Sequence, residues 1–178
     1  MNCTFTNNKA NSAGGAVEIS GNVKLENCSF DKNSAKDGGA VEVTGAASII
    51  NCNFTDNKVL NEIQGYGGAV YWNTSAGNIK NCIFDKNSAF RGGAVYFEKD
   101  GEVTDCKFND NLAGDGGAVW FTEKGTVENS IFVKNEAWNE YGGGICFYVY
   151  VHNVQPGIII DYATGESALE FNGVVYTE

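Results

Sequence analysis

The residues of this chain that could do chemistry are carboxylates, thiols and aromatic rings. Its 178 residues include 22 acidic and 12 basic side chains, one histidine and six cysteines. Paired carboxylates can cleave glycosidic bonds, clustered thiols can bind metals or form disulfides, and exposed aromatic rings can bind other molecules. Which of these chemistries is open to the chain depends on the spacing that the fold imposes on the residues.

One repeated motif determines that spacing. Asn-Cys-x-Phe, or a close variant, is followed by Asn three residues after the Phe, and then by Gly-Gly-Ala-Val or Gly-Gly-Gly-Ile. The phenylalanines of the six copies are Phe5, Phe30, Phe54, Phe84, Phe108 and Phe132. They are separated by 25, 24, 30, 24 and 24 residues, and the copies cover residues 1–147.

The period and composition of the repeat predict an all-β solenoid. A period near 24 is shorter than that of helix-pair repeats, which is about 33 or more, and the leucine-rich pattern is absent. Short segments rich in Val, Ile, Phe and Tyr lie between turn residues, which is typical of strands. We predict a single-stranded parallel β-helix of six repeat coils, with about 24 residues and three short strands per coil.

Alternation along each strand assigns an inner and an outer face. The Val or Ile after each Gly-Gly pair, the residue two positions later and the phenylalanines should point into the core. Leu25 and Cys28 are both expected inside but are three residues apart, so a bend should fall at Asn27, because asparagine tolerates the left-handed conformation. The two rows of asparagines are therefore expected to form turn ladders along the solenoid.

Five cysteines should form a row of free, buried thiols. The row comprises Cys3, Cys28, Cys52, Cys82 and Cys106. Stacked cysteines have parallel side chains, which disfavours the dihedral angle of a disulfide. A straight row also cannot supply the tetrahedral ligand set of zinc. We therefore predict neither a metal site nor a cofactor.

The outer row of the strand after Gly-Gly carries the candidate binding site. This row reads Glu18, Glu42, Tyr71, Tyr96, Trp120 and Cys146, and further rings near the Gly-Gly turns should lie beside it. The candidate ligand-binding residues are Tyr66, Tyr71, Phe90, Tyr96, Trp120, Trp138 and Tyr141. An exposed aromatic strip indicates a surface for glycans or proteins, whereas cross-strand packing that only stabilises the sheet is the alternative. A longer loop in the third copy, residues 58–66, ends close to this strip.

Catalysis finds less support in the sequence. Glu18 and Glu42 would lie about one coil apart, near the carboxylate spacing of a retaining glycosidase. No third acid or base converges on them, and His152 lies outside the repeats. We predict no catalytic residues and keep a polysaccharide-cleaving enzyme of β-helix type as the alternative.

Charge and hydropathy bear on the partners. The formal net charge is −10, the lysines are scattered along the sequence, and Arg91 is the only arginine, so a nucleic-acid partner is not expected. The sequence contains no run of about 18 apolar residues, so no membrane span is predicted. The first residues do not read as a signal peptide and fall inside a repeat, which suggests a piece of a longer chain.

The repeat pattern stops after Phe147. Residues 148–178 are predicted to form a final coil and a C-terminal cap, because a solenoid must cover its last coil. Asn172-Gly173 lies between two apolar segments, which is a strong signal for the turn of a hairpin. At the other end, the first coil could stack coaxially on upstream repeats or on another copy.

The paired motifs resemble those of known surface proteins. Phe30-Asp31-Lys32-Asn33 followed by Gly38-Gly39-Ala40-Val41, with its equivalents in the other copies, is similar to the repeats of chlamydial polymorphic outer membrane proteins and of adhesin-like surface proteins of methanogenic archaea. The resemblance covers residues 1–147. It implies a right-handed β-helix, a secreted or cell-surface location, and adhesion to a glycan or protein on a host or neighbouring cell. A purely structural spacer is the remaining alternative.

Overall fold

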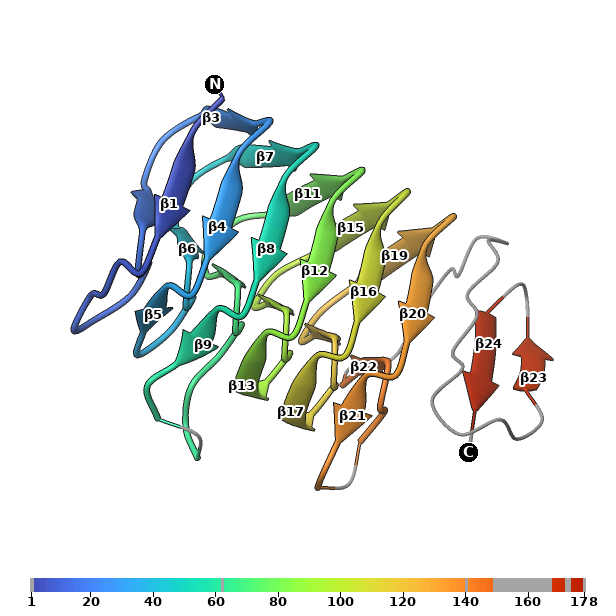
Figure 1. Cartoon of the computed structure of the whole chain (residues 1–178). Coiled ribbons are helices and arrows are strands. Elements are labelled where there is room, and N and C mark those ends of the chain that lie inside the picture. Colours follow the sequence, from blue (N-terminus) through green and yellow to red (C-terminus); the bar gives the residue numbers. More distant parts are fainter. Residues whose placement is uncertain (1, 62, 140, 149–167, 172–173, 178) are drawn as a thin grey trace.

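Six stacked coils form a parallel β-solenoid (Figure 1). The computed structural model describes residues 2–61, 63–139, 141–148, 168–171 and 174–177. The regular secondary structure of these residues consists of strands alone. Equivalent strands of neighbouring coils pair in parallel, and the paired residues are mostly 24 or 25 positions apart in the sequence. The predicted all-β solenoid is therefore confirmed. These residues also include no helix of the length and apolarity that a membrane crossing would need.

The coils build four parallel sheets. We number these sheets by the order in which their strands follow the Gly-Gly pair along the chain. The first sheet contains β2 (Val17–Ile19), β6 (Val41–Val43), β10 (Val70–Trp72), β14 (Val95–Phe97), β18 (Val119–Phe121) and β22 (Ile145–Phe147). The second contains β3 (Val23–Glu26), β7 (Ala47–Ile50), β11 (Gly77–Lys80), β15 (Gly101–Thr104) and β19 (Gly125–Glu128). The third contains β1 (Thr4–Thr6), β4 (Ser29–Asp31), β8 (Asn53–Thr55), β12 (Ile83–Asp85), β16 (Lys107–Asn109) and β20 (Ile131–Val133).

The fourth sheet corrects the prediction of three strands per coil. It contains β5 (Ser34–Ala35), β9 (Lys58–Val59), β13 (Ser88–Arg91), β17 (Leu112–Asp115) and β21 (Glu136–Ala137). Its strands have only two to four residues and lie between the ladder asparagine and the Gly-Gly pair. They are too short to show a clear alternation of apolar and polar residues, and so the sequence pattern missed them.

The predicted core rows are confirmed. The six phenylalanines of the third sheet stack face to face, with ring centroids 4.7–4.8 Å apart and interplanar angles of 3–6°. Between the first and second sheets, large rings lie against glycines: Cβ atoms on Gly77, Gly101 and Gly125 would each come within 2.5 Å of the ring at Trp72, Phe97 or Phe121. In the first two coils smaller pairs occupy these positions, so side-chain volume is balanced within each coil.

Both asparagine rows are ladders, as predicted. The bend residues Asn27, Asn51 and Asn81 have φ angles of 50–54°, and the Asn51 and Asn81 amides donate to the asparagine of the preceding coil. The row after the phenylalanines contains five buried residues, and the amide of each of the first four donates to the Oδ1 of the asparagine in the next coil at 2.8–3.0 Å. These residues are Asn33, Asn57, Asn87, Asn111 and Asn135.

The thiols of the cysteine row are free, as predicted, and those of Cys28, Cys52, Cys82 and Cys106 are buried. Cys3 is exposed, contrary to the prediction, because it lies in the first described coil, which has a neighbouring coil on one side only. The backbone N–H of Cys52 donates to the sulfur of Cys82, 3.3 Å away, while the thiol of Cys52 lies 3.2 Å from the carbonyl oxygen of Ile50. Ser130 ends the row with the same two contacts, accepting from the N–H of Cys106 and donating to the carbonyl of Glu128. The thiols thus act as small hydrogen-bonding groups of the turn.

Two further strands lie in the C-terminal segment. β23 (Ala168–Phe171) and β24 (Val174–Thr177) pair antiparallel, with Phe171 opposite Val174. The turn expected at 172–173 lies outside the described residues, and so does most of the segment 148–178 in which the final coil was expected. The assignment of 148–178 as a cap, separate from the repeats of 1–147, stays a prediction.

Candidate functional site

The outer row of the first sheet is aligned as predicted but is not an exposed strip. Tyr71, Tyr96 and Trp120 are partners in adjacent strands. However, Tyr96 is 4% exposed and Trp120 is 1% exposed. The expectation that these two rings face solvent is therefore wrong. They point away from the main core, yet other segments cover them.

The covering side chains come from the Gly-Gly turns and the end of the repeats. The ring of Tyr66 lies 4.7 Å from that of Tyr96 and 5.8 Å from that of Tyr71, and the ring of Tyr148 lies 5.2 Å from that of Trp120. Tyr66 and Tyr71 remain half-buried. The row therefore forms a second, smaller apolar cluster on the outside of the first sheet.

Arg91 lies beside this cluster, and the sequence analysis did not predict its role. Its guanidinium group lies 4.9 Å from the ring centroid of Trp120 and 5.5 Å from that of Phe90. Its Nε lies 3.5 Å from the carboxylate of Asp115, whose side chain is 2% exposed. The pairing of Arg91 with Asp115 at equivalent positions of consecutive coils was the available signal. Arg91 covers Trp120 and compensates a buried charge, which explains why the strip is closed.

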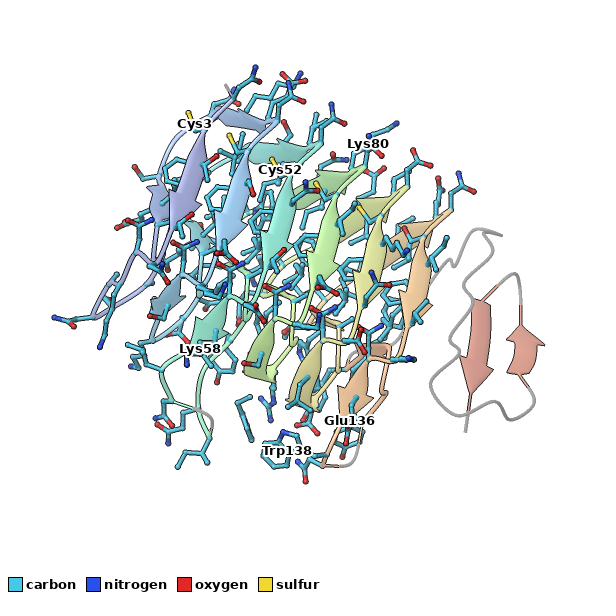
Figure 2. The ribbon with its side chains drawn as sticks, in the orientation of Figure 1. Cys3, Cys52, Lys58, Lys80, Glu136 and Trp138 are labelled. Carbon is cyan, nitrogen blue, oxygen red and sulfur yellow. The ribbon has the colours of Figure 1, made fainter. Side chains whose placement is uncertain are left out.

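Phe90 does not join the strip, contrary to the expectation. It belongs to β13 in the fourth sheet, and its ring contacts Trp138, with 6.1 Å between the centroids. Gly114 lies between them: a Cβ there would come within 3.1 Å of the ring of Phe90. The glycine therefore allows rings two coils apart to meet. Trp138 follows β21 and is 53% exposed (Figure 2). With Phe90 it therefore presents an accessible aromatic face.

A hollow of about 140 Å³ adjoins this face. Its lining residues are Val59, Ser88, Ala89, Leu112 and Trp138. We call Phe90, Trp138 and this hollow the aromatic corner. Leu60, which directly follows β9, is an exposed apolar residue of the longer third-copy loop. Of the other sequence-predicted site residues, Tyr141 is exposed, but it is not among the residues that line the hollow.

The two glutamates considered for catalysis are brought side by side. Glu18 and Glu42 are Cα partners in β2 and β6. Glu42 is 9% exposed, and burial raises the pKa of its carboxyl group, to which the neighbouring Glu18 carboxylate adds. The amide of Asn73 donates to Glu42 at 3.4 Å. A carboxyl group with a raised pKa beside a second carboxylate can serve as a proton donor.

No set of three or more His, Cys, Asp or Glu side chains is placed to hold a metal ion within the part of the chain that the structure describes. The cysteines lie in a row, and their sulfur atoms are engaged with backbone groups. The candidate chemistry of the described surface therefore lies in the aromatic corner and in the glutamate pair.

Comparison with known proteins defines the class. Residues 1–155 match the family described as the right-handed β-helix region. The chain therefore belongs to the right-handed β-helix family, in agreement with the parallel coils and with the predicted handedness. No curated protein and no solved structure matched the chain.

Proposed function

We propose that this chain is a non-enzymatic β-helix segment of a secreted or cell-surface adhesin, and that it binds a glycan at the aromatic corner. The observation that carries the proposal is the exposed ring of Trp138 beside a hollow lined by Leu112 and Ser88. A flat apolar ring next to a hydroxyl group suits a sugar, which has an apolar face and a polar rim. The adhesive role and the surface location rest on the resemblance of the repeats.

The architecture supports a binding role at this place. Coils stacked through parallel pairing form a rod in which each coil contacts only its neighbours, so a ligand site must lie on an outer face or turn. The fourth sheet and its turns carry the longest insertion, in the third copy. In solenoids such insertions gather on one face, often the binding face.

Replacing Trp138 by alanine should abolish most glycan binding. Removing an aromatic anchor at the centre of a contact typically costs about 2 kcal/mol or more, which corresponds to roughly a 30-fold loss of affinity. A glycan array followed by calorimetry on the best ligand measures this change. Trp138 is exposed, so the free energy of unfolding should be little affected.

The matched control is Ile131→Ala. Ile131 is a 44% exposed apolar residue on β20 and is absent from the lining of the aromatic corner. It should leave binding unchanged. If the unaltered protein binds no glycan, or if Trp138→Ala binds as well as the control, the glycan proposal fails and the role of a structural spacer is favoured.

A second candidate is a polysaccharide-cleaving enzyme, which the raised pKa of Glu42 beside Glu18 favours. Under our leading proposal we expect no release of reducing ends from a polysaccharide panel at any pH between 4 and 8. If release occurs and falls about 100-fold or more in Glu42→Gln, but not in Glu102→Gln, the enzyme replaces the adhesin as the function. Glu102 is an exposed carboxylate on β15 and serves as the control.

A further inference from the structure

A second hollow borders the aromatic corner. It has a volume of about 560 Å³, within the range of ligand pockets. Its lining residues are Asn7, Lys32, Asp56, Lys58, Lys86 and Ser88. Ser88 also lines the hollow of the aromatic corner. Ser88 therefore borders both hollows, which places them next to each other.

Lysines outnumber aspartates among the residues that line the second hollow, although the protein is acidic. Three lysines and one aspartate line it, whereas the formal net charge of the chain is −10. Lys32 and Lys86 each pair with the preceding aspartate, with shortest N–O distances of 3.4 and 3.3 Å, and these pairs are solvent-exposed. Exposed pairs contribute little free energy, so both ammonium groups can also bind an incoming anion.

Lys58 is the lysine of the hollow that lies on a strand of the fourth sheet. It lies on β9 between Ser34 and Ser88, its partners in the adjacent strands. No carboxylate among the described residues lies within ion-pair distance of its ammonium group. An exposed lysine without an ion-pair partner, in a hollow lined by two further lysines, attracts an anion without first having to lose an existing contact.

The outer row of the fourth sheet is positively charged at one end and negatively charged at the other. From the third coil onwards it reads Lys58, Ser88, Leu112 and Glu136. Figure 2 shows Lys58 on β9 toward one end of this face, and Glu136 with Trp138 toward the other. Because the charge changes sign along the row, a ligand that spans it must have its anionic group at the Lys58 end.

We propose that the site takes an anionic glycan, whose carboxylate or sulfate lies among Lys32, Lys58 and Lys86 while a neighbouring sugar ring packs on Trp138. The proposal rests on the glycan-binding function proposed above and specifies its ligand class. Lys58 and Glu136 then set selectivity in opposite directions: the first attracts the anion and the second repels it. Neither should matter for a neutral glycan.

Calorimetric titration with three probes tests this assignment. They are a hexasaccharide containing glucuronate, its carboxyl-reduced neutral form, and a sulfated form of that neutral hexasaccharide. Lys58→Gln should weaken binding of the anionic probes by roughly fivefold, and Glu136→Gln should strengthen it by roughly twofold. Binding of the neutral probe should stay unchanged in both variants. The two anionic probes distinguish a carboxylate from a sulfate as the natural group.

The control variant is Lys107→Gln, which removes an exposed lysine on β16 that lines neither hollow. Equal affinity of the unaltered protein for anionic and neutral probes, or an unchanged affinity in Lys58→Gln, would overturn the anionic assignment. In that case binding of the neutral probe that is lost in Trp138→Ala still supports the proposed function. If none of the three probes binds, this inference fails, whereas the proposed function fails only if the glycan array also shows no binding.

Discussion

Replacing Asn87 by alanine is expected to lower the free energy of unfolding by about 3–5 kcal/mol. The side chain of Asn87 is fully buried and makes contacts on both sides of its coil. Its Oδ1 accepts from the backbone N–H and the amide of Asn57, and its amide donates to Asn111 and to the carbonyl of Phe54. Alanine would leave several of these buried groups without partners, at about 1–3 kcal/mol for each.

Two measurements check this result. Urea unfolding measures the loss of stability. Hydrogen exchange should show that the backbone N–H of Asn57, which donates to Asn87, exchanges faster than the backbone N–H groups of neighbouring residues. Asn8→Ala is the matched control, since Asn8 occupies the same ladder but is exposed and donates only to Asn33. Its effect should stay below about 1 kcal/mol. Similar losses of stability in the two variants would contradict the role assigned to the buried ladder.

Replacing Gly93 by alanine is expected to cost at least about 3 kcal/mol. Gly93 is the second glycine of its pair, and a Cβ atom there would lie 2.1 Å from the carbonyl oxygen of Gly117 and 2.7 Å from that of Leu112. Both obstacles are backbone atoms of the next coil, so no side chain can move to relieve the clash. The parallel pairing of the fourth and fifth coils would have to be disrupted.

Gly21→Ala provides the control. Gly21 has no heavy atom within 4 Å of the position of an added Cβ. It should be neutral or slightly stabilising, because alanine restricts the unfolded chain. Thermal unfolding followed by far-ultraviolet circular dichroism compares both variants with the unaltered protein. If the free energies of unfolding of the two variants differ by less than about 1 kcal/mol, the close backbone contact at Gly93 is not needed for stability.

These two positions show why the sequence is informative about the fold. A ladder asparagine and a Gly-Gly pair recur in each coil because a solenoid imposes the same contacts on every repeat. One sequence of six copies therefore carries the kind of information that usually comes from several related sequences. The core rows, the left-handed bends and the free thiols could all be predicted from it.

The candidate site was less predictable. Alternation correctly placed Tyr96 and Trp120 on the outer face, but not their burial beneath Tyr66, Tyr148 and Arg91. Phe90 was assigned to the wrong cluster, because β13 is a strand that the pattern had not revealed. Exposure depends on which neighbouring segments cover a face, and those segments, which here are a Gly-Gly turn, the end of β13 and the end of the repeats, differ between the copies.

The sequence by itself determined the solenoid, its period and its inward-facing residues. Only the tertiary structure decided which outward-facing residues remain accessible and which of them meet. Lys32, Lys58 and Lys86 are scattered along the chain, yet stacking brings them around one hollow that adjoins the hollow of Trp138. The physical reason is that burial in the core follows from a local alternation that every repeat obeys, whereas a surface site is formed by side chains from different coils, whose positions relative to one another only the stacking establishes.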